Sequence, residues 1–258
     1  MGCDIHFHVE VRAMPADPTG AALRRAIIAA PDDQVVRAAY ADWRQENPHL
    51  APAAWVRHDW EARYASSTDE GALRLYDYDR LFEDPLFVGR SYDLFAILAG
   101  VRNGYGFAGV KTGDGFVPIA RPRGLPDDAT PAVKAESDGL DGDGHSHSYL
   151  SVAELDAYDW TRMTWHRGWV DADNYRAWKE RGKPNQWSWG VRSGTTRRLS
   201  HARMEAAIAA GRPDQAYTPV KWAEPYHCAA GRFYDVTLPA LRRLGPADEV
   251  RIVFWFDN

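Results

Sequence analysis

The first strand predicted from the sequence carries side chains that could bind a metal ion or move protons. Residues 3–12 alternate between apolar and polar types, which is the two-residue period of a β-strand. One face of this strand holds only polar side chains, namely Asp4, His6, His8 and Glu10. Same-face neighbours on a strand lie about 6.6–6.8 Å apart at Cα, so imidazoles at this spacing can converge on one metal ion. The alternative is a solvated sheet face without chemistry.

A second histidine pair lies in residues 138–147, which are predicted to form a polar loop. Within it, two carboxylates and two histidines alternate with Gly and Ser, and the spacing does not fit an EF-hand. A loop can bring its histidines to the first strand, so we hypothesise a joint site for a divalent metal, with zinc favoured over manganese or iron. The predicted ligands are Asp4, His6, His8, His145 and His147, with Glu10 or Asp143 as general base. The alternative is an exposed loop that binds nothing.

The first motif also resembles a known kind of site. The pattern Asp4-x-His6-x-His8 is similar to the strand motif that opens metal-dependent amidohydrolase and PHP-type phosphoesterase sites. The resemblance implies a metal-dependent hydrolase acting on a phosphorylated or nucleotide-like small molecule. It is confined to the motif, because the regular strand–helix repeat of a barrel does not follow.

A tryptophan-rich segment favours a second function. Residues 160–190 contain six tryptophans, and residues 191–203 are basic. Aromatic rings stack on nucleobases and arginine binds phosphate. This predicts a substrate-binding set of Trp187, Trp189, Arg192, Arg197 and Arg198. The corresponding function is a non-catalytic binding protein that sequesters a nucleotide signal or a protein partner. Core tryptophans beside a solvated basic loop are the alternative.

Composition limits the partners. The 258 residues carry a net charge of −5, which argues against nucleic acid or a membrane as partner and leaves a small molecule or nucleotide. Cys3 and Cys228 are too few for a disulfide framework, which predicts a reduced, cytoplasmic protein. Cys3 falls on the apolar side of the first strand and is expected to be buried and unreactive. The pattern Gly-x-Gly-x-x-Gly at 104–109 follows a predicted helix and not a strand, which disfavours a dinucleotide site.

Few strands and many irregular helices predict an α+β fold. We expect a mixed or antiparallel central sheet that includes the N- and C-terminal strands, with the nearly apolar strand 249–256 at its centre. A small helical insertion at 19–66 would interrupt a main domain formed by 1–18 and 67–258. Helices are predicted at 19–30, 32–45, 52–64, 92–102, 151–158, 200–210 and 235–244, with a short one opening at 130–131.

Two further resemblances concern larger parts of the chain. Residues 26–33 and 39–43 resemble the repeat-companion domain found widely in planctomycetes and related bacteria, although Arg44 stands where that family has Leu. This implies an interaction module and a possible protein partner for 19–66. Residues 1–13 and about 85–258 resemble an uncharacterised family of phage and bacterial proteins that open with Gly-Cys-Asp-Ile-His. That family implies one recurrent fold with a polar centre and supplies no reaction.

Overall fold

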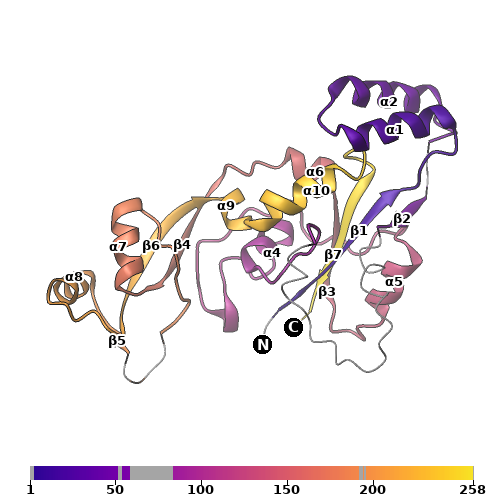
Figure 1. Cartoon of the computed structure of the whole chain (residues 1–258). Coiled ribbons are helices and arrows are strands. Elements are labelled where there is room, and N and C mark those ends of the chain that lie inside the picture. The colour runs from indigo at the N-terminus through magenta and orange to yellow at the C-terminus, as the bar shows by residue number, and fades with distance from the viewer. Residues whose placement is uncertain (1–2, 52–53, 59–83, 192–193, 195, 258) are drawn as a thin grey trace, which may run out of the picture. The chain divides into compact units, whose positions relative to one another are not determined.

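The computed structural model describes residues 3–51, 54–58, 84–191, 194 and 196–257 (Figure 1). The chain divides into two compact units. Unit 1 comprises Met1–Gly2, Ser91–Pro118 and Asp159–Ala230, and unit 2 comprises Cys3–Arg90, Ile119–Tyr158 and Gly231–Asn258. Each unit combines helices with a small sheet, so the α+β prediction is confirmed. None of the described helices is long and apolar enough to cross a membrane.

Unit 2 is built on a four-stranded antiparallel sheet with the order β2-β1-β7-β3. These strands are β2 (Trp55–Arg57), β1 (Ile5–Arg12), β7 (Val250–Phe256) and β3 (His145–Ser151). All seven residues of β7 are buried, which confirms the predicted central position of this strand. The N- and C-terminal strands pair directly, with Ile5 opposite Phe256 and Val11 opposite Val250. The sheet therefore joins the two ends of the sequence.

Short helices cover the sheet of unit 2. Helix α5 (Pro131–Asp138) packs Val133 against Val253 and Trp255 of β7. Helix α6 (Val152–Ala157) follows its N-cap residue Ser151, which forms a capping box with Glu154. A π-helical turn, η3 (Phe233–Thr237), leads into α10 (Leu238–Arg242), in the range where one helix was predicted.

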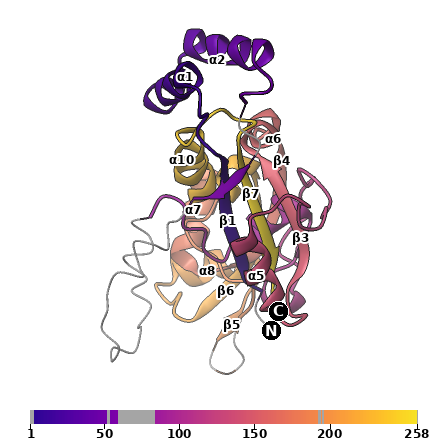
Figure 2. The same cartoon turned by 90° about the vertical axis from the view of Figure 1, so that its right-hand side faces the viewer.

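The predicted helical insertion contains a hairpin of α1 (Pro18–Ala29) and α2 (Gln34–Glu46), seen side by side in Figure 2. A Cβ on Gly20 would lie 2.2 Å from Cη2 of Trp43, so the two helices approach each other over a glycine. The Tyr40 hydroxyl donates to Glu249 at 3.0 Å, and the Arg24 guanidinium lies 3.2 Å from the same carboxylate. Tyr40, within the 39–43 segment that resembles the repeat-companion domain, thus anchors the hairpin to the chain that leads into β7.

Two local predictions in unit 2 are wrong. The range 52–64 was predicted as a helix, but Trp55–Arg57 forms the strand β2; residues 52–53 and 59–64 lie outside the described residues. Trp55 and Val56 are residue types that favour strands, and they pair with the edge of β1. This pairing with a distant segment determines the conformation of 55–57. The range 138–147 was predicted as a loop, but β3 begins at His145 because its residues pair with β7.

Unit 1 contains a three-stranded sheet with the order β4-β6-β5. Strands β4 (Met163–Val170) and β6 (Ala216–Pro225) are antiparallel, and β5 (Arg197–Arg198) runs parallel to β6. Helices α7 (Ala172–Arg181) and α8 (His201–Ala209) pack on it through a core that includes Tyr175, Met204 and Trp222. The remaining elements are α4 (Tyr92–Ala99), the 3-10 turn η2 (Phe107–Gly109) and α9 (Tyr226–Ala230).

Candidate functional site

Three of the predicted histidines gather around one tryptophan on the sheet of unit 2. Trp255 of β7 lies opposite His6 of β1, and the two rings stack with centroids 5.5 Å apart. The His8 ring stacks on the same indole at 4.6 Å, and the His147 ring of β3 at 5.3 Å. The first strand and one member of the second histidine pair, His147, therefore meet on one sheet face. We call this group the Trp255 cluster.

His145 does not join the Trp255 cluster. Between His145 and Ser148 the register of β3 shifts, so that His145 pairs with Phe256 and Ser148 with Phe254. Ser146 adopts a positive φ of 55° at this bulge. A bulge adds one residue and re-aims the side chains around it. As a result the His145 ring packs against Phe256, whereas His147 shares the face of Trp255.

Much of the polar face of β1 is buried and not exposed to solvent. His8 is only 3% exposed and Glu10 is fully buried, because α5 and the chain before it cover this face. Burial, together with the positive charges of Arg57 and His6, lowers the pKa of His8 to about 3. Neither ring nitrogen of His8 has a hydrogen-bond partner among the described residues. His8 is therefore a neutral imidazole inside the protein at neutral pH.

Glu10 belongs to a buried ion pair. Its carboxylate accepts from the Arg251 guanidinium at 2.7 and 2.8 Å and from the backbone N–H of Thr130 at 2.7 Å. Arg251 also donates to Asp128 at 2.7 Å, and its guanidinium lies over the Trp55 ring, 3.9 Å from the centroid. With both oxygens engaged and no access to water, Glu10 has a structural role in this geometry.

The other predicted residues of this site lie near the surface. Asp4 pairs with Arg90, His6 lies 3.2 Å from the Asp257 carboxylate, and Asp143 is exposed in the turn before β3. Among the described residues, no group of three or more His, Cys, Asp or Glu side chains is placed to hold a metal ion. The predicted metal ligands among the described residues are thus not arranged as a three-ligand site.

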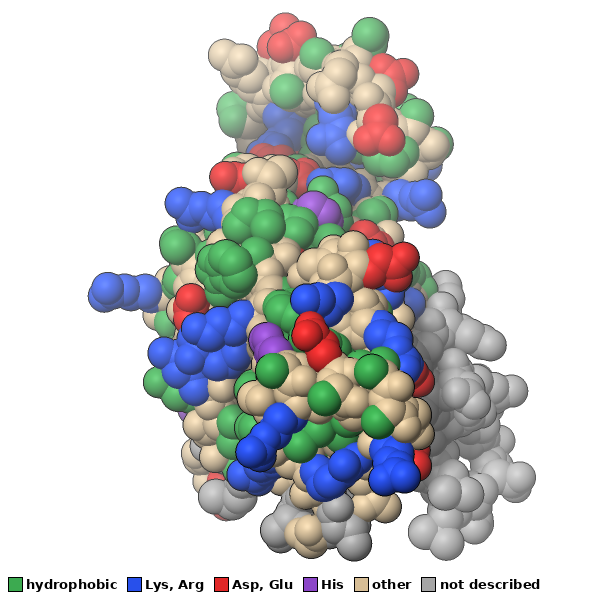
Figure 3. All heavy atoms as spheres, turned by 90° about the vertical axis from the view of Figure 1, so that its left-hand side faces the viewer, with side chains coloured by type: hydrophobic (Ala, Val, Ile, Leu, Met, Phe, Trp, Pro, Cys, Tyr) green, Lys and Arg blue, Asp and Glu red, His purple; other side chains and the backbone are tan. Residues whose placement is uncertain are grey.

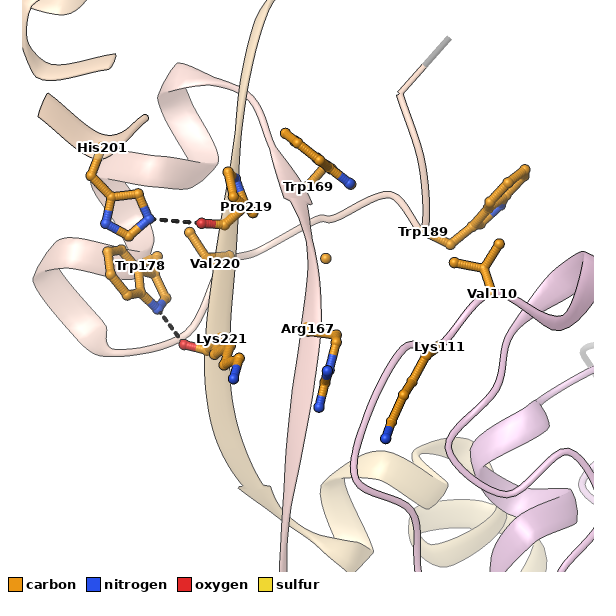
Figure 4. Close-up of a pocket in the computed structure, with 11 residues that line it drawn as sticks. Val110, Lys111, Arg167, Trp169, Trp178, Trp189, His201, Pro219, Val220 and Lys221 are labelled. Carbon is orange, nitrogen blue, oxygen red and sulfur yellow. Dashed lines mark hydrogen bonds between the residues drawn. The ribbon is translucent and has the colours of Figure 1, made fainter. Parts of the chain in front are cut away.

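A pocket of about 500 Å³ in unit 1 combines cationic and aromatic side chains (Figure 4). Strand β4 alternates, so that Arg167 and Trp169 share one face. Arg167 lies opposite Lys221 of β6, and its backbone N–H donates to Thr112 in the loop that contains Lys111. Lys111, Arg167 and Lys221 therefore form a row across three neighbouring chain segments, which we call the cation row. In Figure 4 these three side chains point toward the same end of the pocket.

The charges of the cation row are only partly neutralised. The Arg167 guanidinium pairs with Asp114 at 2.5 Å, and that carboxylate is itself more than half exposed. Lys111 and Lys221 are exposed and have no carboxylate partner among the described residues. Two lysines on neighbouring segments with no acidic partner create a local positive potential, which attracts an anion despite the negative charge of the whole chain.

Aromatic rings form the rest of the pocket. Trp169 and Trp189 lie toward the end opposite the tips of the cation row in Figure 4, and Trp178 and His201 line one side. The Trp178 Nε1–H donates to the Lys221 carbonyl at 2.8 Å, and His201 Nε2 lies 2.7 Å from the Pro219 carbonyl. Trp178 and His201 therefore contact backbone carbonyl groups on the edge of β6, where the described part of the chain has no neighbouring strand to form hydrogen bonds with them.

The predicted tryptophan–arginine set contributes unequally to this pocket. Trp189 lines it, whereas Trp187 packs on Gly168 and Trp222 beneath. Arg198 lies over the Trp169 ring, 5.5 Å from its centroid, and donates to the Val191 carbonyl. Arg197 donates to the carbonyls of Arg212 and Asp214 and so braces a turn. Arg192 lies outside the described residues.

Six charged or aromatic residues that line the pocket are absent from the predicted set, namely Lys111, Arg167, Trp169, Trp178, His201 and Lys221. For Arg167 and Trp169 the sequence did contain a signal. Trp165, Arg167 and Trp169 occupy every second position, which is the period of a strand and predicts that they share one face. The lysines carried no local signal, since only pairing of distant segments places them beside Arg167. Figure 3 shows several Lys and Arg side chains on the face where α7 and α8 lie.

Comparisons with known proteins give no functional assignment, so the Trp255 cluster and the pocket of unit 1 are the available evidence on function. No family model, no curated protein and no solved structure matches this chain.

Proposed function

We propose that this protein binds a nucleotide-like anion in the pocket of unit 1 and does not transform it. The observation that carries the proposal is the cation row beside Trp169 and Trp189 in one pocket. A phosphate group meets the positive charges, and a planar base stacks on the indole rings. Neither contact requires a metal ion.

Base stacking and phosphate contacts together favour a ligand that has both a negative charge and an aromatic ring. Stacking of a base on an aromatic side chain contributes about 1–3 kcal/mol. Phosphate contacts with lysine and arginine contribute an attraction that weakens as salt screens it. A ligand with only one of the two features leaves half of the pocket unused. A nucleoside phosphate has both features.

The lining residues favour binding over catalysis. Among the described residues that line the pocket there is no carboxylate, thiol or hydroxyl side chain that could act as nucleophile or general base. His201 is the one histidine among the described residues that line the pocket, and its Nε2 is engaged with the Pro219 carbonyl. Nothing in this set activates water, so the bound ligand stays intact.

Removal of the two lysines from the cation row is expected to weaken nucleotide binding at least tenfold. The variant is Lys111→Ala/Lys221→Ala, and the ligand is a nucleoside monophosphate titrated by calorimetry and by tryptophan quenching. The wild type should lose affinity as salt rises, and the double variant should show a flatter salt dependence. Lys179→Ala is the matched control, because Lys179 pairs with Glu205 on the surface of the same unit.

The proposal fails if the double variant and Lys179→Ala bind the nucleotide with the affinity of the wild type. It also fails if no member of a panel of nucleoside mono-, di- and cyclic phosphates changes the tryptophan fluorescence. Release by denaturation after long incubation separates binding from turnover. An unchanged ligand supports the binding protein, and a hydrolysed ligand supports an enzyme.

Metal-dependent hydrolysis is the second candidate, and one observation favours it. The two His8 nitrogens without a hydrogen-bond partner are atoms that a bound ion or water would satisfy. If a metal is held, protein purified without chelator should contain about one equivalent of zinc, manganese or iron by ICP-MS. The variant His6→Ala/His8→Ala should then lose it. Metal-free wild-type protein that keeps its stability in EDTA would remove this candidate.

A further inference from the structure

Trp165 is an exposed tryptophan that the pocket does not use. It lies on β4, two residues before Arg167, and is 53% exposed. Its indole makes no ring contact with another side chain among the described residues, and its backbone carbonyl accepts from Asp114 N–H. A tryptophan half in water forgoes the large stabilisation that burial of an indole provides. Such an exposed ring is a candidate for contact with a ligand.

The strand places Trp165 on the face of the cation row. Side chains at alternate positions of a strand point to one face, so Trp165, Arg167 and Trp169 lie in line along β4. At about 3.3–3.4 Å per residue, the Cα atoms of the two tryptophans are about 13 Å apart, with Arg167 midway. The cation row thus has an aromatic side chain on each side, one in the pocket and one outside it.

The composition of unit 1 agrees with a polyanionic ligand. Residues 159–230 carry 12 Lys and Arg against 7 Asp and Glu, although the whole chain carries 31 against 36. The exposed aromatic side chains among the described residues are Tyr105, Phe107, Trp165, Trp187 and Trp189, and all of them belong to unit 1. Exposed aromatic rings interleaved with positive charge are typical of surfaces that bind unpaired nucleotides.

We infer that the site takes two nucleotides joined by a phosphate, with one base on Trp165, the other on Trp169, and the linking phosphate on the cation row. This inference rests on the proposed function and names its ligand class. The shared chemistry is that of a free dinucleotide and of a step within a single strand of nucleic acid.

The spacing excludes stacked bases. Neighbouring bases in a duplex strand lie about 3.4 Å apart, far less than the separation of the two tryptophans. Two unpaired bases splayed to either side of their phosphate can reach both rings. The site should therefore reject a duplex, in which pairing and stacking hold the bases in place.

The test compares Trp165→Ala with the wild type on four probes by calorimetry. The probes are adenosine monophosphate, an adenine dinucleotide with a 3′,5′ link, a single-stranded adenine oligonucleotide and the corresponding duplex. We expect Trp165→Ala to lose about tenfold in affinity for the dinucleotide and to bind the monophosphate as the wild type does. Trp187→Ala is unsuited as a control because Trp187 is packed against Trp222, and Phe107→Ala is unsuited because the Phe107 ring contacts Trp189 of the pocket. Tyr105→Ala serves, because its ring is exposed and makes no ring contact among the described residues.

The outcomes separate this inference from the proposed function. If the monophosphate binds but the dinucleotide binds no more tightly, and Trp165→Ala changes neither, the inference is overturned and the proposed function stands. If no nucleotide binds the wild type, both fail. An oligonucleotide that binds more tightly than the dinucleotide identifies a nucleic acid strand as the source, and equal affinities identify the free dinucleotide. Equal affinity for the duplex would also overturn the inference.

Discussion

Glu10→Gln is expected to lower the free energy of unfolding by about 3–5 kcal/mol, the range found when one partner of a buried ion pair is removed. The substitution keeps the shape of the side chain but removes its charge. The Arg251 guanidinium, only 6% exposed, then keeps just the peripheral Asp128 as an acidic partner. Urea unfolding followed by tryptophan fluorescence measures the change.

Two further variants show whether the loss comes from the unpaired Arg251. Asp173→Asn breaks the exposed pair with Arg176 and should change the free energy of unfolding by less than about 1 kcal/mol. The double variant Glu10→Met/Arg251→Met removes both charges and should recover much of the stability lost in Glu10→Gln. Equal losses in Glu10→Gln and Asp173→Asn would contradict the structural role of Glu10.

Acidification from pH 7 to pH 5 is expected to remove about 2 kcal/mol of stability through His8 alone. The pKa of His8 is about 3 in the folded protein and near 6.5 in the unfolded chain, because burial and the positive charges of Arg57 and His6 disfavour its protonation. Between these values the unfolded chain binds a proton that the folded protein excludes. The stabilisation is complete above pH 6.5 and is lost as the pH falls toward 3. Burial also lowers the pKa of His147, which adds to the effect with the same sign.

His8→Phe is the variant that isolates this effect. Phenylalanine keeps a ring against Trp255, and no hydrogen bond of the described residues is lost. The variant should be about as stable as the wild type at pH 7 and should lose most of the pH dependence between 7 and 5. Burial raises the pKa of Asp93 and of Glu249 in the folded protein, so the result is the difference between His8→Phe and the wild type, in which the contribution of these two carboxyl groups is common to both. If the free energy of unfolding of His8→Phe depends on pH as strongly as that of the wild type, groups other than His8 cause the pH dependence.

Local patterns made much of the fold predictable. The capping residues Asp33, Ser151 and Ser200 begin helices because each side chain accepts a backbone N–H of the first turn, and this needs no distant partner. The apolar run of β7 predicted a central strand, because such a run is stable only when both sheet faces are covered. The helix predicted at 52–64 failed over Trp55–Arg57, where the edge of β1 supplied a pairing that helix periodicity cannot anticipate.

The candidate sites were predictable only in part. Alternation along β1 was enough to put His6 and His8 on one face, and the tryptophan-rich segment drew attention to Trp189. The bulge at Ser146 could not be anticipated, and it alone separates His145 from His147. Nor could the sequence indicate that the polar face of β1 is covered, since that depends on α5 folding back over it.

The sequence by itself determined which residues share a face of each strand and where most helices begin, because these properties depend on neighbours within a few positions. Only the tertiary structure decided that His8 and Glu10 are buried and that Lys111 and Lys221 flank Arg167. Burial and charge neighbours arise from segments far apart in the chain, and they determine which polar side chains remain free to meet a ligand. For that reason the ligand site that we propose lies at the cation row of unit 1 and not at the histidines of the first strand.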